Sequence, residues 1–181
     1  SYLEIGNHNR IREGANINVG TKGGGGITRL GDHNMVMVYA HIAHDCQVGN
    51  HVILVNGATF GGHVCVEDHA VISAYSCVHQ FNRVGTMAMI AGGSMVTQDV
   101  PPYPTVHGDR AVLKGLNLIG LKRRGFSSKV LDQIKEAYRV LFRENLNLEE
   151  AVEHIDQLKL ESPEVKHLIL FLQTAERGFC M

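Results

Sequence analysis

The residues best suited to chemistry in this sequence are histidines, of which the chain has 11 in 181 residues. His41, His44, His63 and His79 fall in one repetitive segment, and Asp45 directly follows His44. A carboxylate that holds one nitrogen of an imidazole ring leaves the other nitrogen free to accept a proton, as a general base does. Because consecutive side chains of a flat strand point to opposite faces, the His44–Asp45 pair requires a corner in the chain.

The element that positions these histidines is predicted by a six-residue repeat. Every sixth residue from Leu30 to Val96 is large and apolar, and the same step occurs earlier at Ile5, Ile11 and Ile17. A unit of six residues suits one short strand and a turn, and three such units form one triangular coil of a parallel β-helix. The sequence therefore predicts a β-helix over residues 1–109, interrupted by a glycine-rich loop at about residues 20–28.

This repeat also predicts where the histidines meet. With 18 residues in each coil, His44, His63 and His79 are expected close to one edge of the prism on successive coils. Stacked imidazoles about 5 Å apart would line a polar groove, given the usual spacing of neighbouring strands.

The segment after the repeat reads as helices. Three prolines near residues 101–104 end the strand stacking. We expect a helical domain over residues 110–181, with helices at about 127–145, 148–160 and from Pro163 onward. Ser127 and Ser162 are the expected N-caps of the first and third helices.

Composition excludes several other classes of protein. A net charge of -1 argues against general nucleic-acid binding, and no apolar run reaches the length of a membrane span, about 18 residues. The four cysteines form no C-x-x-C pair, which disfavours a structural zinc site and fits reduced thiols in the cytoplasm. A chain that starts at Ser1 without a signal-peptide pattern is expected to be the interior of a longer protein.

A metal site on the histidine edge is the first alternative to acid–base chemistry. β-Helical carbonic anhydrases bind zinc through an H-x4-H pair and a third histidine from another coil. This chain has H-x2-H at His41 and His44 and no H-x4-H in the repeat. We therefore expect neither a metal nor another cofactor.

Several local motifs resemble one enzyme family. The motifs are A-H-I-A-H-D-C at 40–46, G-G-H-V at 61–64, V-H-Q-F at 78–81, Q-D-V-P-P-Y at 98–103 and G-L-K-R-R-G-F at 120–126. They resemble the UDP-N-acetylglucosamine O-acyltransferases, which catalyse the first step of lipid A synthesis. The resemblance runs from Ile5 to the end of the chain. It implies a left-handed β-helix, a cytoplasmic homotrimer and transfer of an (R)-3-hydroxyacyl chain from acyl carrier protein to the sugar 3-hydroxyl, without metal.

The resemblance also assigns roles to individual residues. It implies that His44 is the general base, that Asp45 orients it and that the backbone N–H of Gly62 stabilises the oxyanion. It implies that Gly92 limits the length of the acyl chain. The remaining substrate positions that it implies are His41, His63, His79 and Gln80 in the repeat and Asn117, Arg123 and Arg124, linked to the nucleotide, in the tail.

Two departures from the family pattern leave alternatives open. The N-terminal coils of the family, with an acidic residue and a lysine that contact substrate, have no counterpart here. Ile119 stands where family members often carry a glutamate. The alternatives are the related N-acyltransferase of lipid A synthesis, whose tail lacks the G-L-K-R-R-G-F motif, a zinc lyase, and an inactive trimeric fragment.

Overall fold

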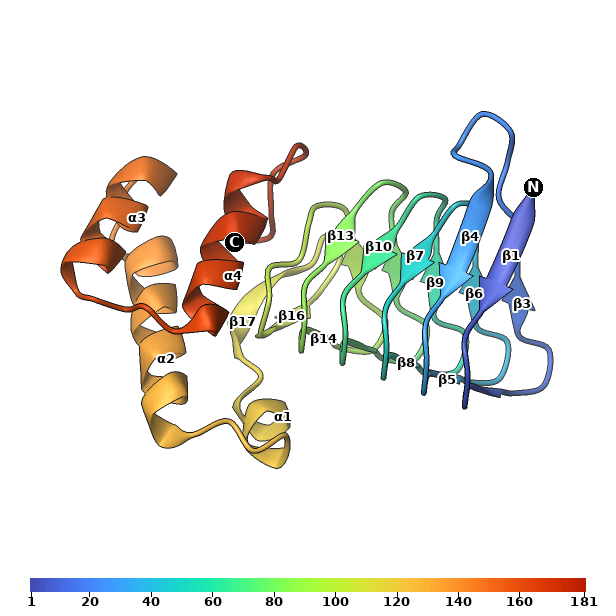
Figure 1. The fold of residues 1–181 in the computed structure, drawn as a ribbon, viewed down its shortest axis with the longest axis horizontal. Coiled ribbons are helices and arrows are strands. Elements are labelled where there is room, and N and C mark those ends of the chain that lie inside the picture. The colour runs from blue at the N-terminus through green and yellow to red at the C-terminus, as the bar shows by residue number, and fades with distance from the viewer.

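The computed structural model describes residues 1–181 as a three-sided parallel β-helix followed by a helical tail (Figure 1). Each coil contributes one short strand to each of three sheets, which we name A, B and C. Between the second coil and β15, parallel strands pair with partners 18 residues away, as Arg29 does with Gln47 and His41 with Thr59. The predicted β-helix is confirmed.

The three sheets divide the strands in rotation. Sheet A contains β1 (Tyr2–Ile5), β4 (Ile27–Leu30), β7 (Gln47–Val48), β10 (Cys65–Val66) and β13 (Arg83–Val84). Sheet B contains β2 (Arg10–Ile11), β5 (Met35–Val36), β8 (Ile53–Leu54), β11 (Val71–Ile72), β14 (Met89–Ile90), β16 (Pro104–His107) and β17 (Val112–Leu116). Sheet C contains β3 (Asn16–Ile17), β6 (His41–Ile42), β9 (Thr59–Phe60), β12 (Cys77–Val78) and β15 (Met95–Val96).

The apolar position of the six-residue repeat forms the core of the prism. From Leu30 to Val96, each of these residues ends a strand and is at most 4% exposed. Burial of one such side chain contributes about 1.5–3 kcal/mol, so the repeat accounts for much of the stability of the fold. Ile5 and Ile11 are each 44% exposed, because they lie on the first coil and only one neighbouring coil covers them.

Three corners join the sheets, and each repeats one backbone conformation. Corner 1 joins sheets A and B, corner 2 joins B and C, and corner 3 joins C and A. Each corner holds a residue with positive φ in successive coils, a conformation that non-glycine residues adopt uncommonly. Corner 1 holds His8, His33, His51, His69 and Met87; corner 2 holds Gly14, Tyr39, Gly57, Tyr75 and Gly93; corner 3 holds Asp45, His63 and Phe81.

The glycine-rich loop lies at corner 3 of the first coil, between β3 and β4. Tyr2 pairs with Ile27, 25 positions further on, so this coil is seven residues longer than those that follow. The predicted end of the loop at about residue 28 is too late, because Ile27 and Thr28 already pair in β4. Gly20 allows the loop to close, since a Cβ there would lie 2.0 Å from the backbone nitrogen of Ile27.

The tail begins with an antiparallel hairpin, β16 and β17, that extends sheet B. Four helices follow: α1 (Leu118–Arg123), α2 (Ser128–Arg143), α3 (Leu148–Gln157) and α4 (Pro163–Gln173). Ser127 and Ser162 cap α2 and α4, as predicted. The hairpin and α1 were not predicted, and the boundary expected between residues 109 and 110 falls within the turn of the hairpin.

The tail returns to the prism through α4 and the C-terminus. Arg83 donates to Asp99 and to the carbonyl of Phe171 in α4, and His167 contacts Glu67 at 2.7 Å. The backbone of Cys180 donates to the carbonyl of Asp99. In Figure 1, α4 accordingly lies beside the last coils of the prism. No helix combines the length and the apolar character needed to cross a membrane.

Candidate active site

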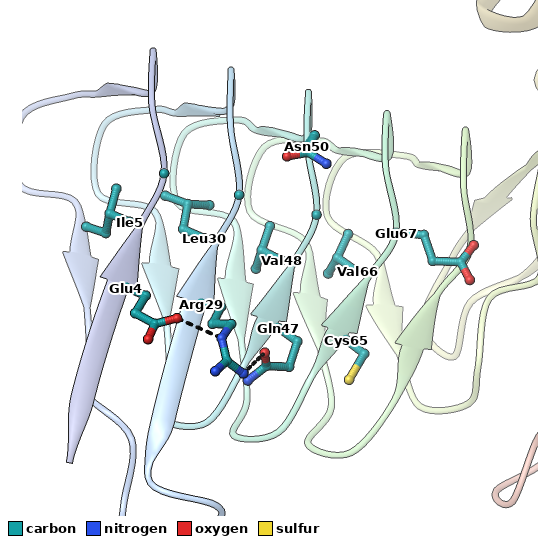
Figure 2. A pocket seen from close by; sticks show the side chains of 13 residues that line it. Glu4, Ile5, Arg29, Leu30, Gln47, Val48, Asn50, Cys65, Val66 and Glu67 are labelled. Carbon is teal, nitrogen blue, oxygen red and sulfur yellow. Dashed lines mark hydrogen bonds and ion pairs between the residues drawn. The ribbon is translucent and has the colours of Figure 1, made fainter.

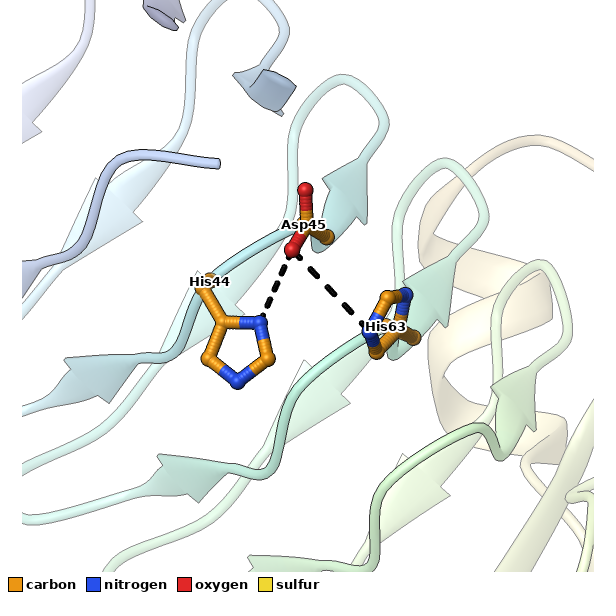
Figure 3. A group of neighbouring side chains, drawn as sticks. All are labelled: His44, Asp45 and His63. Atoms are coloured by element: carbon orange, nitrogen blue, oxygen red, sulfur yellow. Dashed lines mark hydrogen bonds and ion pairs between the residues drawn. The ribbon is translucent and has the colours of Figure 1, made fainter. Parts of the chain in front are cut away.

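His44 and Asp45 form the centre of the candidate site, at corner 3 directly after β6 (Figure 3). Asp45 has a φ of 61°, and this turn brings two consecutive side chains onto the same side of the chain. The Nδ1 atom of His44 lies 2.8 Å from Oδ2 of Asp45. The corner that the sequence analysis required for this pair is therefore present.

The carboxylate of Asp45 is held by the glycine-rich loop. The backbone N–H of Thr21 donates to Oδ1 at 3.0 Å, and its hydroxyl donates to Oδ2 at 2.7 Å. The backbone N–H of Asp45 donates to the hydroxyl of Thr28 at 2.8 Å. Burial alone would raise the pKa of Asp45, but the hydrogen bonds from Thr21 and His44 hold this pKa well below its usual range. Asp45 is therefore an anion that orients His44.

Thr21 is a site residue that the sequence analysis missed. The loop was recognised only as an insertion, and nothing in its sequence shows which residue it would face. Gly24 lets the loop lie close, since a Cβ there would be 2.2 Å from Oδ2 of Asp45 and 2.5 Å from the ring of His63. The length of the loop and its position one coil before the His44–Asp45 corner were the available signals.

The three expected histidines do not form one stack. His63 meets His44 edge to face, with ring centroids 5.3 Å apart, and its Nε2 lies 3.9 Å from Oδ2 of Asp45. The ring that stacks on His63 is Phe81, at 4.5 Å, because Phe81 occupies the same corner position one coil later. His79 comes two residues before that position, and its Nδ1 lies 3.1 Å from the carbonyl oxygen of Gln80.

Gly62 lies against the imidazole of His44. A Cβ at this glycine would be 2.7 Å from Cε1 and 2.8 Å from Nε2 of that ring. The residue is buried, and its backbone N–H donates to no group of the chain. The equivalent N–H groups of Asp32 and Asn50 at corner 1 donate to side chains of the next coil. Gly62 thus offers an unused donor beside the candidate base.

The outer face of sheet C connects this centre to Gly92. Its outward row contains three half-buried residues in register, His41, Thr59 and Cys77. Nδ1 of His41 lies 2.9 Å from Oδ1 of Asn16, the first residue of the row. Gly92 is exposed beside corner 2 and has no positive φ. The only nearby atom that a Cβ there would meet is the carbonyl oxygen of Ala74, at 3.5 Å, so the position has room for a larger side chain.

The predicted nucleotide residues lie at a different corner. Arg124 extends to His69 at corner 1, where its guanidinium donates to Nδ1 of that ring. Arg123 is exposed at the end of α1. Both ends of the Asn117 amide are engaged within the chain: Nδ2 donates to the carbonyl of Met87 and Oδ1 caps α1. One protomer therefore does not bring these residues to His44.

Cysteine chemistry is disfavoured at this site. Cys46 is fully buried, and its thiol contacts the carbonyl oxygen of Gly61 at 3.2 Å. Burial raises the pKa of Cys46 to about 12, so the thiol stays protonated near neutral pH. Cys46 is thus unsuited to act as a nucleophile.

His44, Asp45 and His63 are also the one group of side chains close enough to share a metal ion, with ligand atoms within 4.8 Å of one another. The carboxylate of Asp45 already accepts hydrogen bonds from the backbone and hydroxyl of Thr21 and from His44. A metal would have to displace some of these bonds. The donor set therefore suits an orienting carboxylate better than a metal ligand.

A separate groove of about 570 Å³ runs along the outer face of sheet A (Figure 2). Across this groove, Arg29 donates to Glu4 at 2.8 Å and to Gln47 at 3.4 Å, and Glu67 also lines it. The lining contains no histidine. Its two carboxylates are engaged within the chain, Glu4 by Arg29 and Glu67 by His167 and the backbone of Thr86.

Comparison with known proteins bears on both parts of the chain. Residues 99–180 match the family described as Udp N-acetylglucosamine O-acyltransferase; Domain 2, and residues 27–62 match the bacterial transferase hexapeptide repeats. The chain is 49% identical over 176 residues to an acyl-[acyl-carrier-protein]--UDP-N-acetylglucosamine O-acyltransferase of Myxococcus xanthus. It is 43% identical over 176 residues to the protein of the same name from Alkalilimnicola ehrlichii. Each alignment covers 97% of this chain and 68% of the relative.

Solved structures agree with this result. The chain is similar to UDP-N-acetylglucosamine acyltransferases from Francisella novicida and Campylobacter jejuni, each with a TM-score of 0.94 and 41% identity. The first comparison covers 98% of this chain and 65% of that structure, and the second covers 100% and 71%. The similarity extends over the prism and the helical tail together.

Proposed function

The chain belongs to the UDP-N-acetylglucosamine O-acyltransferase family, and from this we propose that it transfers an (R)-3-hydroxyacyl chain from acyl carrier protein to the 3-hydroxyl of UDP-N-acetylglucosamine. This reaction is the first step of lipid A synthesis, and we propose that it takes place in the cytoplasm. The observation that carries the proposal is the His44–Asp45 pair, which leaves Nε2 of His44 free at a surface edge of the prism.

The proton transfer follows from this geometry. The bond between Nδ1 and Asp45 places the ring proton on Nδ1, so Nε2 can accept the proton of the sugar hydroxyl. The hydroxyl oxygen then attacks the thioester carbonyl, forming a C–O bond and a tetrahedral oxyanion. When that intermediate collapses, the C–S bond breaks, and the imidazolium of His44 returns the proton to the departing thiolate. Imidazole suits both steps because its charge changes near neutral pH.

Gly62 supplies the second requirement of acyl transfer. The oxyanion needs a donor that is already in place, and the unused N–H of Gly62 lies beside the ring of His44. In other enzymes, removal of one such donor costs about 2.7–4 kcal/mol of transition-state stabilisation. No acyl-enzyme is needed, which is consistent with the buried, protonated thiol of Cys46.

We propose that the active protein is a homotrimer with sites between subunits. The support is the division of the predicted site within one chain, with His44 at corner 3 and Arg124 at corner 1. A second copy can bring its corner 1 to face corner 3, and a closed ring of three copies repeats this contact in every cleft.

Complementation tests the shared site. His44→Ala and the double variant Arg123→Ala/Arg124→Ala should each be poorly active alone. Co-expression should restore partial activity, because mixed trimers contain some clefts in which one subunit supplies His44 and its neighbour supplies Arg123 and Arg124. Light scattering of the wild-type protein should report three chains. A monomer at micromolar concentration, or no recovery in mixed trimers, would contradict the shared site.

Acyl transfer itself is tested with purified chain, (R)-3-hydroxyacyl carrier protein and UDP-N-acetylglucosamine. We expect His44→Ala to lower kcat by about 10²–10⁴-fold while the fold and the assembly persist. Cys46→Ser serves as the matched control and should stay active. Near-normal turnover in His44→Ala, or an acyl group trapped on Cys46, would contradict the mechanism.

A further inference from the structure

A second set of histidines, at corner 1, is not used in the proposed reaction. His8, His33, His51 and His69 occupy the left-handed position of four successive coils, with φ between 55° and 62°. Their rings stack along the prism, with centroids 4.8, 4.9 and 4.7 Å apart and interplanar angles of 13°, 3° and 22°. We call these four residues the histidine column.

His8, His33 and His51 of the histidine column line a groove of about 730 Å³ that Arg10 and Arg124 also line. No carboxylate lines the groove. Asp32 and Asp68 directly precede His33 and His69 in the sequence. Their Oδ1 atoms accept hydrogen bonds from backbone N–H groups of the preceding coil, so these carboxylates are engaged by the backbone at corner 1 and not by the groove. The groove is therefore positive in every protonation state of its rings, because the two arginines stay charged.

The ring nitrogens of the column are mostly unused. The rings of His8, His33 and His51 form no hydrogen bond within the chain, and all three residues are exposed. His69 differs, because Arg124 donates to its Nδ1, and a guanidinium can only donate. Burial and the nearby charge of Arg124 lower the pKa of His69, so this ring stays neutral and Arg124 carries the charge at that end.

The geometry disfavours a metal ion in this groove. Zinc binds imidazole nitrogens at about 2.0–2.1 Å, so two ligand nitrogens lie at most about 4 Å apart. Parallel rings 4.7–4.9 Å apart direct their nitrogens side by side instead of toward one point.

An anion with two separated acceptor groups fits the spacing better. A protonated imidazole donates from both nitrogens, and two neighbouring imidazolium rings repel each other unless an anion lies between their donors. A diphosphate can accept from two successive rings, one at each phosphoryl group. Binding of the anion would favour protonation of the rings, and protonation would favour binding to the same extent.

We propose that the groove beside the histidine column binds a phosphoryl anion of the diphosphate class and takes up protons when it does so. His33 and His51 donate to the two phosphoryl groups, and Arg10 and Arg124 supply the flanking positive charge. The anion can be free diphosphate or the diphosphate of a nucleotide, and only the second source rests on the proposed function.

Calorimetry on the full chain tests the proposal with sodium diphosphate and with UDP as the two probes. Binding of diphosphate should be about tenfold or more tighter near pH 6 than near pH 8, with net proton uptake measured from buffers of different ionisation enthalpy. The variant His33→Asn/His51→Asn keeps the corners, since asparagine tolerates positive φ, and should weaken binding about tenfold or more. His107→Asn, an exposed histidine at the end of β16, is the matched control.

Each outcome decides the proposal. No saturable binding near pH 6, equal binding at both pH values, or unchanged binding in His33→Asn/His51→Asn would overturn it. If the double variant does not fold, nitrogen-resolved NMR of the wild type replaces it: the ring signals of His33 and His51 should shift on titration, and static signals would overturn the proposal. Binding of diphosphate but not of UDP by the wild-type chain would assign the groove to the free anion. A chain inactive in acyl transfer that still binds diphosphate through the column would refute the proposed function alone.

Discussion

Substitution of Gly62 by alanine tests the candidate site at the point where a glycine packs directly against the imidazole of His44. The added methyl would lie 2.7 Å from Cε1 and 2.8 Å from Nε2 of His44. Ordinary carbon contacts begin at about 3.5 Å, so the ring must move by roughly 0.7–0.8 Å. The backbone at Gly62 is not in the left-handed region, so the substitution adds no conformational strain of its own.

The size of the effect follows from this displacement. A misplacement of about 1 Å in a reacting group can lower the rate about 10²-fold, so Gly62→Ala should lower kcat by roughly 10–100-fold. The N–H of residue 62 remains in the variant, so the loss reports the position of the imidazole. KM for the sugar nucleotide should change little, because the substitution acts on the reacting group.

The assay is steady-state acyl transfer, with melting temperature and ring NMR signals of His44 recorded in parallel. Gly23→Ala is the matched control, since a Cβ at Gly23 meets no atom within 4 Å and the residue has no positive φ. We expect wild-type kcat in the control and shifted His44 signals in Gly62→Ala. Wild-type turnover in Gly62→Ala would refute the packing of Gly62 against His44 as a constraint on catalysis.

Three further outcomes are expected. Thr21→Val removes the hydroxyl that donates to Asp45 without a change in side-chain shape, and should lower kcat. Thr21→Ser keeps the hydroxyl and should retain kcat near the wild-type value. An equal loss in both variants would mean that the hydroxyl has no positioning role. Gly92→Met should shift the preferred acyl chain to a shorter one in competition assays, and an unchanged preference at full activity would remove Gly92 from the acyl site. The hydrogen bond to Glu67 raises the pKa of His167 above its ordinary value of about 6.5. This contact therefore contributes its full stabilisation below about pH 6.5 and loses it as the pH rises through the raised pKa. The melting temperatures of wild type and His167→Gln should thus differ more near pH 5.5 than near pH 8.5, and the opposite order would contradict the contact.

The prism could be predicted from the sequence because its period is short and strict. A buried residue such as Phe60 is determined by its position in the six-residue repeat, and each coil repeats the pattern. The tail was harder to predict because its first elements lack such a signal. The hairpin of β16 and β17 depends on pairing with β14, and α1 is only six residues long, so neither element has a period of its own in the sequence.

Only the site residues that follow the 18-residue period of the coils could be predicted from the sequence. His44 and His63 meet because 19 residues are one coil plus one position. His79 was expected in the same group, but the corner position one coil after His63 belongs to Phe81. The same reasoning could have found the histidine column, since His33, His51 and His69 are 18 residues apart. Thr21 carries no periodic signal, because the loop adds seven residues to its coil and leaves the register.

The repeat also explains why one chain holds its candidate groups apart. A coil places one residue with positive φ at each corner, so residues that differ by about a whole number of coils share a corner, and residues at different corners are separated by a sheet. His44 and Asp45 lie at corner 3, whereas Arg124 is tied to His69 at corner 1. No change within a single prism can close that distance, because the corners are fixed by the buried apolar residues between them. This separation is why we propose that a site using both sets of residues forms between two copies of the chain.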